Sequence, residues 1–265
     1  GNEFYQLWLD PTMSYSSALY SSDAPRALAS AQLAKYRRIL HRLDARPGQR
    51  VLEIGCGWGA FAETAAREAG LEVLGLTLSP AQRQFARQRM QLAGLEQQVN
   101  IELRDYRDLA GDQFDHVVSV EMFEAVGERW WPSYFETVQR LLAPAGKAVV
   151  QCITIRDDLF ARYRRGTDFI QQHIFPGGML PSPSAFTARA ARAGLAVSDA
   201  FSFGRDYGRT LAEWSTNFEQ HWPQIAALGF DDRFRRLWRF YLAYCQAGFN
   251  SGCTDVMQFE LVHAQ

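Results

Sequence analysis

Hydrophobic positions in the part of the chain after Pro47-Gly48 alternate between two patterns. Short aliphatic and β-branched runs predict strands, and they cover residues 51–54, 72–76, 99–103, 114–120 and 148–155. Longer stretches between them predict helices, at residues 60–69, 80–93 and 131–142. Gly70 and Gly94 stand where glycines end helices. This alternation indicates βαβ units, and therefore an α/β fold with a mostly parallel sheet and helices on both faces.

The second half of the chain first interrupts this rhythm and then resumes it. Residues 156–183 form a mixed polar and aromatic stretch that ends in Phe175-Pro176-Gly177-Gly178, and we expect it to be a cap or insertion over the site. The last part predicts helices at 184–193, 210–221 and 231–249, and strands at 196–203 and 256–263. We therefore expect a seven-stranded sheet in one domain. Its parts are an N-terminal helical cap (1–46), a central core (47–155), the insertion (156–183) and a C-terminal part (184–265).

Composition and charge narrow the function classes. The 265 residues are 47% hydrophobic and 22% charged, as in ordinary globular proteins, and no apolar run approaches the roughly 18 to 20 residues that span a bilayer. A net charge of -1 argues against a nucleic-acid binder. Four cysteines without a CxxC pair and five scattered histidines favour a reduced, cytoplasmic compartment and no metal site. Because the chain begins at Gly1, without methionine, we expect a fragment of a longer protein.

The strongest chemical signal is a glycine loop between the first strand and the first helix after it. The segment reads EIGCGWG over residues 53–59, and such glycines let backbone approach a ligand at a helix N-terminus. Gly55, Gly57 and Ala60 also fit the dinucleotide pattern, but that fold wants an acid at the end of the second strand, where this chain has GLTLS. The acid instead precedes the glycines, at Glu53. An acid followed by Gly55, Gly57 and Gly59 is typical of methyltransferases that use S-adenosylmethionine (SAM), so SAM is favoured over NAD and 47–155 becomes the expected SAM-binding core.

Further motifs make the chain resemble a known family, from its first residues to its last strand. The motifs are DPTMSYSS (10–17), the glycine loop, GLTLSPAQ (75–82), DYRD (105–108), FE and VG (123–124, 126–127), IFPGG and LPS (174–178, 180–182), and DY, TL and Trp214 (206–207, 210–211). Together they resemble the cyclopropane fatty acid synthase and mycolic acid cyclopropane synthase family. The resemblance implies a class I, Rossmann-like SAM-dependent methyltransferase fold.

The same resemblance implies a set of cofactor contacts. They come from Tyr15, Ser16, Gly55, Gly57, Thr77, Leu78, Gln82, Asp105 and Tyr106. Thr77 and Gln82 can hydrogen-bond ribose hydroxyls in place of the missing acid. Tyr106 can stack beside adenine, although core packing alone would also explain an aromatic residue there.

The resemblance further implies transfer of the SAM methyl group to the double bond of an unsaturated fatty acyl chain. The resulting cation must lose a proton, which in the family goes to a bicarbonate held by a cysteine's backbone, a glutamate, a histidine and a tyrosine. The glutamate and tyrosine are present as Glu124 and Tyr207. The cysteine is replaced by Ser17, the histidine by Gln151, and a glycine three residues before the glutamate by Glu121.

These departures fall around one small anion pocket, which suggests a coordinated change. We expect the Glu121 carboxylate to take the bicarbonate position, with Gln151 and Ser17 donating hydrogen bonds to it. A second carboxylate beside Glu124 would raise the pKa of one of the pair and would disfavour another anion. The alternative keeps bicarbonate on Glu124, with Glu121 facing solvent or capping the next turn. The pattern around Glu121 resembles the subgroup linked to methylated and furan fatty acids, so the product is a cyclopropane or a methyl-branched unsaturated chain.

The expected partners are an unsaturated fatty acyl chain or phospholipid and, peripherally, the inner membrane surface, with a homodimer kept open. The arginines of the segment RFRRLWRFY (233–241) and of 162–165 are candidates for contacts with anionic head groups. For the segment 233–241, the favoured interpretation is an amphipathic helix with its apolar face in the core and its arginines in solvent. Two other functions stay open: methylation of a small amine or phenol on nitrogen or oxygen, and a non-catalytic homologue that binds SAM or lipid.

Overall fold

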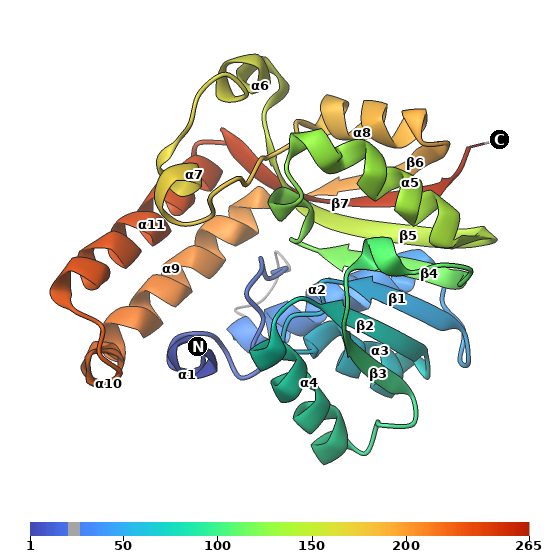
Figure 1. The fold of residues 1–265 in the computed structure, drawn as a ribbon. Helices are drawn as coiled ribbons and strands as arrows, with labels where there is room; N and C mark the ends of the chain where they lie inside the picture. Colours follow the sequence, from blue (N-terminus) through green and yellow to red (C-terminus); the bar gives the residue numbers. More distant parts are fainter. Residues whose placement is uncertain (21–26, 265) are drawn as a thin grey trace.

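A seven-stranded sheet organises the molecule (Figure 1), for which the computed structural model describes residues 1–20 and 27–264. The strand order is β3-β2-β1-β4-β5-β7-β6. The strands are β1 (Arg50–Ile54), β2 (Glu72–Thr77), β3 (Val99–Leu103), β4 (Phe114–Val120), β5 (Leu142–Ile155), β6 (Leu195–Ser202) and β7 (Thr254–His263). The first five run parallel, and β7 lies antiparallel between β5 and β6. The predicted α/β fold class is therefore confirmed.

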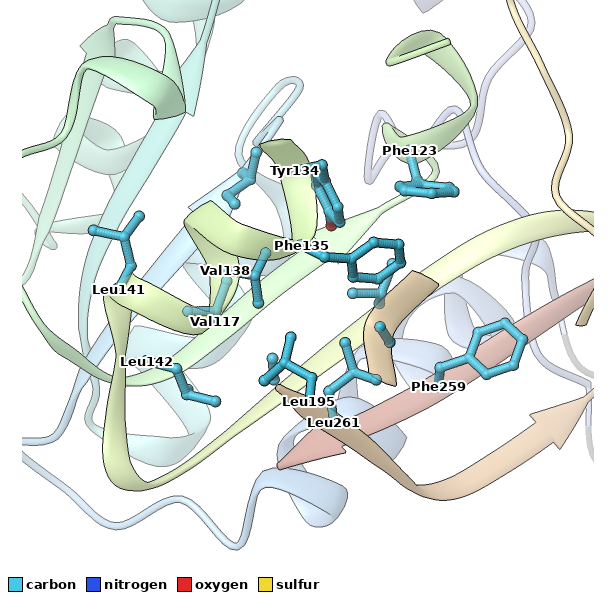
Figure 2. Packing of buried hydrophobic residues seen from close by; sticks show 14 of the residues in the cluster. Val117, Phe123, Tyr134, Phe135, Val138, Leu141, Leu142, Leu195, Phe259 and Leu261 are labelled. Carbon is cyan, nitrogen blue, oxygen red and sulfur yellow. The ribbon is translucent and has the colours of Figure 1, made fainter. Parts of the chain in front are cut away.

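Helices cover both faces of this sheet (Figure 1). One face carries α2 (Leu28–Leu43), α3 (Ala60–Ala69) and α4 (Pro80–Ala93), and the other carries α5 (Trp131–Leu141) and α8 (Pro183–Arg192). The predicted helix ends at Gly70 and Gly94 are confirmed, since both glycines adopt the left-handed conformation. Figure 2 shows the core beneath α5, where Phe135, Val138 and Leu141 meet side chains of β4, β6 and β7.

A third, strongly aromatic core lies beside the sheet. It joins α1 (Asn2–Gln6) to α9 (Gly204–Gln220), α10 (Trp222–Ala227) and α11 (Asp232–Asn250). Phe234, Trp238 and Tyr241 of α11 belong to this core. Arg235 pairs with Glu219 at 2.6 Å. The apolar face of the segment 233–241 is thus a core face, as its amphipathic interpretation proposed.

The start of α9 differs from the prediction by six residues. The sequence predicts a helix from residue 210, whereas the helix begins at Gly204. A Cβ atom at Gly208 would meet the side-chain amide of Asn250 on α11, which would have to move. The helices α9 and α11 approach each other closely here, and the local sequence does not predict this contact. The strand β5 also begins earlier than predicted, at Leu142.

The insertion contains two short helices, α6 (Asp157–Tyr163) and α7 (Phe169–His173). Three 3-10 helices occupy connections near the sheet: η1 (Tyr106–Asp108), η2 (Phe123–Ala125) and η3 (Glu128–Trp130). The end of the insertion is tied to η2, since the Met179 backbone N–H donates to the Glu124 carbonyl at 2.8 Å. Within the described residues, none of the helices combines the length and the apolar character needed to cross a membrane.

Candidate active site

The glycine loop joins the end of β1 to α3, at the edge of the sheet where α/β proteins bind ligands. Gly55 has φ +82°, and a Cβ atom there would lie 2.8 Å from Met122 Cγ. Gly57 has φ +53° and nothing within 4 Å of a Cβ position. Gly59 has φ +83° and precedes the first residue of α3. The loop therefore packs tightly at Gly55 and keeps open space at Gly57, beside the free N–H groups of a helix N-terminus.

Glu53 lies beneath this loop on β1 and is buried. Burial raises the pKa of Glu53 to about 8, although the Ala62 backbone N–H opposes the change. Its Oε2 atom has no hydrogen-bond partner among the described residues. An unpartnered buried carboxyl oxygen below an open glycine is consistent with a loop built to receive a cofactor that carries hydrogen-bond donors. This unpartnered acceptor, together with the open space at Gly57, fits the expected SAM.

The next two strand ends carry the other predicted cofactor residues. After β2, Thr77 Oγ1 donates to Gln82 Oε1 at 2.9 Å, and Leu78 is 71% exposed. After β3, Asp105 accepts two bonds from Arg107, at 2.9 and 2.6 Å, and this pairing lowers the pKa of Asp105. Tyr106 follows in η1. The glycine loop and these residues all lie at the carboxyl ends of β1, β2 and β3.

Tyr15 and Ser16 come from the N-terminal segment, and both of their hydroxyls have protein partners. The hydroxyl groups of Tyr15 and Tyr241 form a hydrogen bond, with 2.7 Å between the two oxygens. The Tyr15 ring packs against Trp8 and Trp214. The Ser16 hydroxyl accepts a hydrogen bond from the Lys35 ammonium group. Each hydroxyl keeps further hydrogen-bonding capacity, because a hydroxyl can donate one bond and accept two.

Glu121 is the centre of a compact cluster at the end of β4. Its Oε1 accepts from the Ser17 backbone N–H at 2.8 Å and from Gln151 Nε2 at 2.8 Å. Its Oε2 accepts from the Tyr207 hydroxyl at 2.6 Å. Burial of this side chain is strong enough to be the largest influence on its pKa, which it raises. The alternative in which Glu121 faces solvent or caps a turn is wrong for this chain, because three donors hold the side chain inside.

Ser17 donates a hydrogen bond to Glu121, as predicted, and it does so through its backbone. The donor to Glu121 is the backbone N–H, while the Ser17 hydroxyl donates to the Ala18 carbonyl at 3.0 Å. The replacement of cysteine by serine therefore does not touch the carboxylate. A backbone donor is available whatever the side chain at this position.

The backbone at Glu121 is strained. Its φ is +50°, a left-handed conformation that costs a residue other than glycine about 1–2 kcal/mol. Such strain persists where surrounding contacts over-determine it and is common at functional sites. The three charge-assisted hydrogen bonds supply those contacts.

Glu124 lies on η2, next to this cluster. Its Oε1 accepts the Ile153 backbone N–H at 2.5 Å, and its buried Oε2 has no partner in the described part of the chain. Burial, and then the neighbouring Glu121, raise the pKa of Glu124 to about 8. Burial also raises the pKa of Glu121, but Lys35 and the three donors oppose that change. Glu121 is therefore the better-stabilised anion, and Glu124 the carboxyl that holds a proton at neutral pH.

Lys35 is the functional candidate that the sequence did not single out. It is fully buried on α2. Burial lowers the pKa of Lys35 to about 8, and the carboxylates of Glu121, Asp10 and Glu53 limit that lowering. The available signal is its position: Lys35 falls on the apolar stripe of α2 together with Leu28, Ala31 and Ile39. A lysine at a core position of an amphipathic helix is rare without a partner charge.

The sheet order, the glycine loop at the end of β1 and the helices on both faces of the sheet define a Rossmann-like protein of the class I methyltransferase type. Comparison with known proteins gives its family. The profile described as mycolic acid cyclopropane synthetase matches residues 1–259, and the chain belongs to that family.

Individual relatives agree with this assignment. Tuberculostearic acid methyltransferase UfaA1 of Mycobacterium tuberculosis is 42% identical over 98% of this chain and 62% of its own length. Cyclopropane-fatty-acyl-phospholipid synthase of Escherichia coli is 39% identical over 100% of this chain and 65% of its own length. The crystal structure of mycolic acid cyclopropane synthase CmaA1 with SAH and CTAB superimposes with a TM-score of 0.91 at 30% identity, covering 98% of this chain and 94% of the other. The chain thus spans less than two thirds of the length of these two curated relatives.

Proposed function

We propose that this chain catalyses transfer of the SAM methyl group to the double bond of an unsaturated fatty acyl chain, and that Glu121 is the base that completes the reaction. The observation that carries the proposal is the Glu121 carboxylate held by Ser17, Gln151 and Tyr207, within a chain of the cyclopropane synthetase family. Relatives named as a fatty-acyl-phospholipid synthase and a fatty acid methyltransferase support the substrate class.

The cofactor would be held along the carboxyl ends of β1, β2 and β3. The backbone of Gly55, Gly57 and Gly59 would line one side. Thr77 and Gln82 would exchange their mutual hydrogen bond for hydrogen bonds to ribose hydroxyls. Asp105, Tyr106 and the exposed Leu78 would border the adenine, and Glu53, Tyr15 and Ser16 would complete the surroundings. When bound, SAM supplies an electrophilic methyl group.

The residues of the chain would then orient the alkene, exclude water and remove a proton. Attack by a weak π nucleophile depends mainly on alignment in a dry site. The methylated chain is a cation that must lose one proton, and the Glu121 carboxylate accepts it. Tyr207 and Gln151 hold the two carboxylate oxygens in place. Proton loss from the new methyl group closes a ring, whereas loss from a neighbouring carbon leaves a methyl-branched alkene.

A bound bicarbonate would be unnecessary in this arrangement. The Ser17 backbone N–H and the Tyr207 hydroxyl, which the resemblance assigns to bicarbonate, already donate to Glu121. Another anion beside this carboxylate would meet like-charge repulsion. Glu124, beside this cluster, keeps a carboxyl oxygen without a partner among the described residues, but that group lies next to the same charge.

Access to lipid would come from the face formed by α7 and α11. Phe175, Phe240 and Tyr244 are 46%, 53% and 41% exposed there, and Phe169 packs between Phe240 and Tyr244. Aromatic side chains with nearby arginines suit the interface of an anionic phospholipid bilayer. We therefore propose that this face meets the membrane that holds the substrate.

The test uses the full-length protein with methyl-deuterated SAM and unsaturated phospholipid vesicles, with and without bicarbonate. The released fatty acid esters are read by mass spectrometry before and after mild hydrogenation. The proposal expects label in the acyl chain at a rate independent of bicarbonate. A labelled chain that takes up hydrogen is a branched alkene, and one that resists is a cyclopropane.

Other results would overturn the proposal. Absence of label in lipid, with label in amines or phenols, would establish a small-molecule methyltransferase. Tight SAM binding with no acceptor methylated would establish a non-catalytic homologue. Transfer that requires bicarbonate would remove Glu121 from the role of base.

A further inference from the structure

A row of side-chain hydrogen bonds connects α2 to the Glu121 carboxylate. Arg38 Nη1 donates to Gln258 Oε1 at 2.6 Å, Gln258 Nε2 donates to Gln151 Oε1 at 2.9 Å, and Gln151 Nε2 donates to Glu121 Oε1 at 2.8 Å. Gln258 and Gln151 face each other across β7 and β5, where they are register partners. Both amides are buried. The row thus crosses the sheet at one level.

The direction of every bond in this row follows from its first member. A guanidinium group has only donors, whereas an amide can present either its oxygen or its nitrogen. Arg38 therefore requires the oxygen of Gln258, which leaves the nitrogen of Gln258 for Gln151. Gln258 in turn requires the oxygen of Gln151, which leaves the nitrogen of Gln151 for Glu121. Reversing any amide would place two donors or two acceptors against each other.

Arg38 is itself fixed by contacts outside the row. Its Nη2 lies 3.1 Å from Asp199 Oδ2, and its guanidinium carbon lies 3.9 Å from the centre of the Phe201 ring. Both residues belong to β6. A planar group stacked on a ring and paired with a carboxylate holds one orientation. The side-chain amides of Gln258 and Gln151 are therefore also held in one orientation.

We propose that Arg38 is a positioning residue for Glu121, acting through Gln258 and Gln151 to keep an amide N–H donor on the carboxylate. An N–H donor favours the charged carboxylate, while an amide oxygen in its place would favour the protonated form. This inference rests on the proposed function, because the base must be ionised to accept a proton. Gln258 is likewise a positioning residue, and neither side chain touches the reacting atoms.

The other groups that face Glu121 stay unchanged in the tests below. They are Lys35 from α2, Tyr207 from α9, Glu124 from η2, Cys152 from β5 and the Ser17 backbone N–H. Those that face Arg38 are Asp199, Glu260 and Arg42. Any change in the titration of Glu121 then reports on the row itself.

The experiment titrates the full-length protein after labelling its glutamate carboxyl carbons with ¹³C, and follows them by NMR, with Glu121→Gln to assign the signal. Arg38→Met and Gln258→Met should each raise the midpoint of Glu121 by about one pH unit. Arg38→Lys keeps a donor-only group and should restore the wild-type midpoint. Arg37→Met is the matched control. Arg37 is the next residue on α2 and pairs with Glu68 on the exposed side, so this substitution should change nothing. In the methyl-transfer assay, the acid limb of kcat should move with the midpoint while KM for SAM stays constant.

The outcomes separate the relay from its alternatives. A shift with Arg38→Met but none with Gln258→Met would mean that the charge of Arg38 acts through space, and would overturn the relay. Circular dichroism would reveal whether Arg38→Met folds. If it does not fold, Gln258→Met alone decides, and an unchanged Glu121 midpoint in that variant overturns the relay. Because the titration needs no turnover, a protein that methylates no lipid would refute the proposed function while the midpoints still decide the relay.

Discussion

Glu121 and Glu124 are three residues apart and share one site, yet their carboxylates have opposite surroundings. Glu121 accepts three hydrogen bonds, whereas Glu124 accepts one from Ile153 and keeps a buried oxygen without a partner among the described residues. Two adjacent carboxyl groups with unlike environments divide the roles of anion and acid between them. The pair can therefore offer a charged base without also presenting a second negative charge at neutral pH.

The first prediction concerns the base itself. Glu121→Gln keeps the size of the side chain but removes the charge, and methyl transfer should fall by about 10²–10⁴-fold. Glu121→Gly instead empties the space and leaves the Ser17 N–H and Tyr207 hydroxyl without an acceptor. Added bicarbonate should restore activity to the glycine variant alone, since the glutamine amide blocks the space. Rates measured on vesicles with labelled SAM decide this, and a glutamine variant as fast as wild type would contradict it.

A second prediction follows from the raised pKa of Glu124, about 8 against 4.5 for a free side chain. A carboxyl group whose pKa is higher in the fold than in the unfolded chain stabilises the fold fully below pH 4.5, and that contribution is lost as the pH rises to 8. The free energy of unfolding should therefore fall between pH 5 and 8 by up to about 1.4 kcal/mol per pH unit from this group.

Glu124→Gln should make the free energy of unfolding less dependent on pH. Part of the dependence should remain, because the pKa of Glu53 is also raised to about 8. Urea denaturation at pH 5.5, 6.5 and 7.5 measures the slope. Glu136→Gln, on the exposed side of α5, controls for the loss of a carboxylate at the surface. Equal slopes for wild type and Glu124→Gln would show that Glu124 is charged throughout this range.

The two lysines of the chain provide the third prediction. Lys35 is fully buried near Glu121, whereas Lys147 is one-third exposed and pairs with Glu260 at 3.6 Å. Lys35→Met removes the positive charge that opposes protonation of Glu121, so the acid limb of the pH–rate profile should move up by about one pH unit. Lys147→Met should leave the profile unchanged. Identical profiles for the two variants would refute a role for Lys35 at the site.

The sequence predicts the parts of this molecule that depend on local pattern. The parallel strands, Gly70 and Gly94 follow from hydrophobic period and helix-end chemistry, and they hold in the structure. The cluster of Glu121, Gln151 and Tyr207 was predicted from the family resemblance rather than from spacing.

The residues that were missed depend on tertiary pairing. Arg38 and Gln258 are 220 positions apart in the chain, and each is unremarkable in its own segment. The Tyr15 hydroxyl likewise meets the Tyr241 hydroxyl across 226 positions of the chain. No local pattern contains such pairs. Gln258 is brought into place by the pairing of β7 with β5, and Tyr241 by the packing of α11 against the N-terminal segment in the aromatic core.

The last prediction separates folding from cofactor binding within the glycine loop. Gly55→Ala places a methyl group 2.8 Å from Met122 Cγ at φ +82°, so the fold should lose about 1–3 kcal/mol. Gly57→Ala meets nothing within 4 Å and should cost only about 1 kcal/mol. Its methyl group, however, enters the space that the loop keeps open, so S-adenosylhomocysteine should bind at least about tenfold more weakly. Thermal denaturation and isothermal titration calorimetry on both variants measure the two effects. Wild-type affinity in Gly57→Ala would place the cofactor elsewhere, whereas weak binding with near-normal stability assigns the open side of this loop to it.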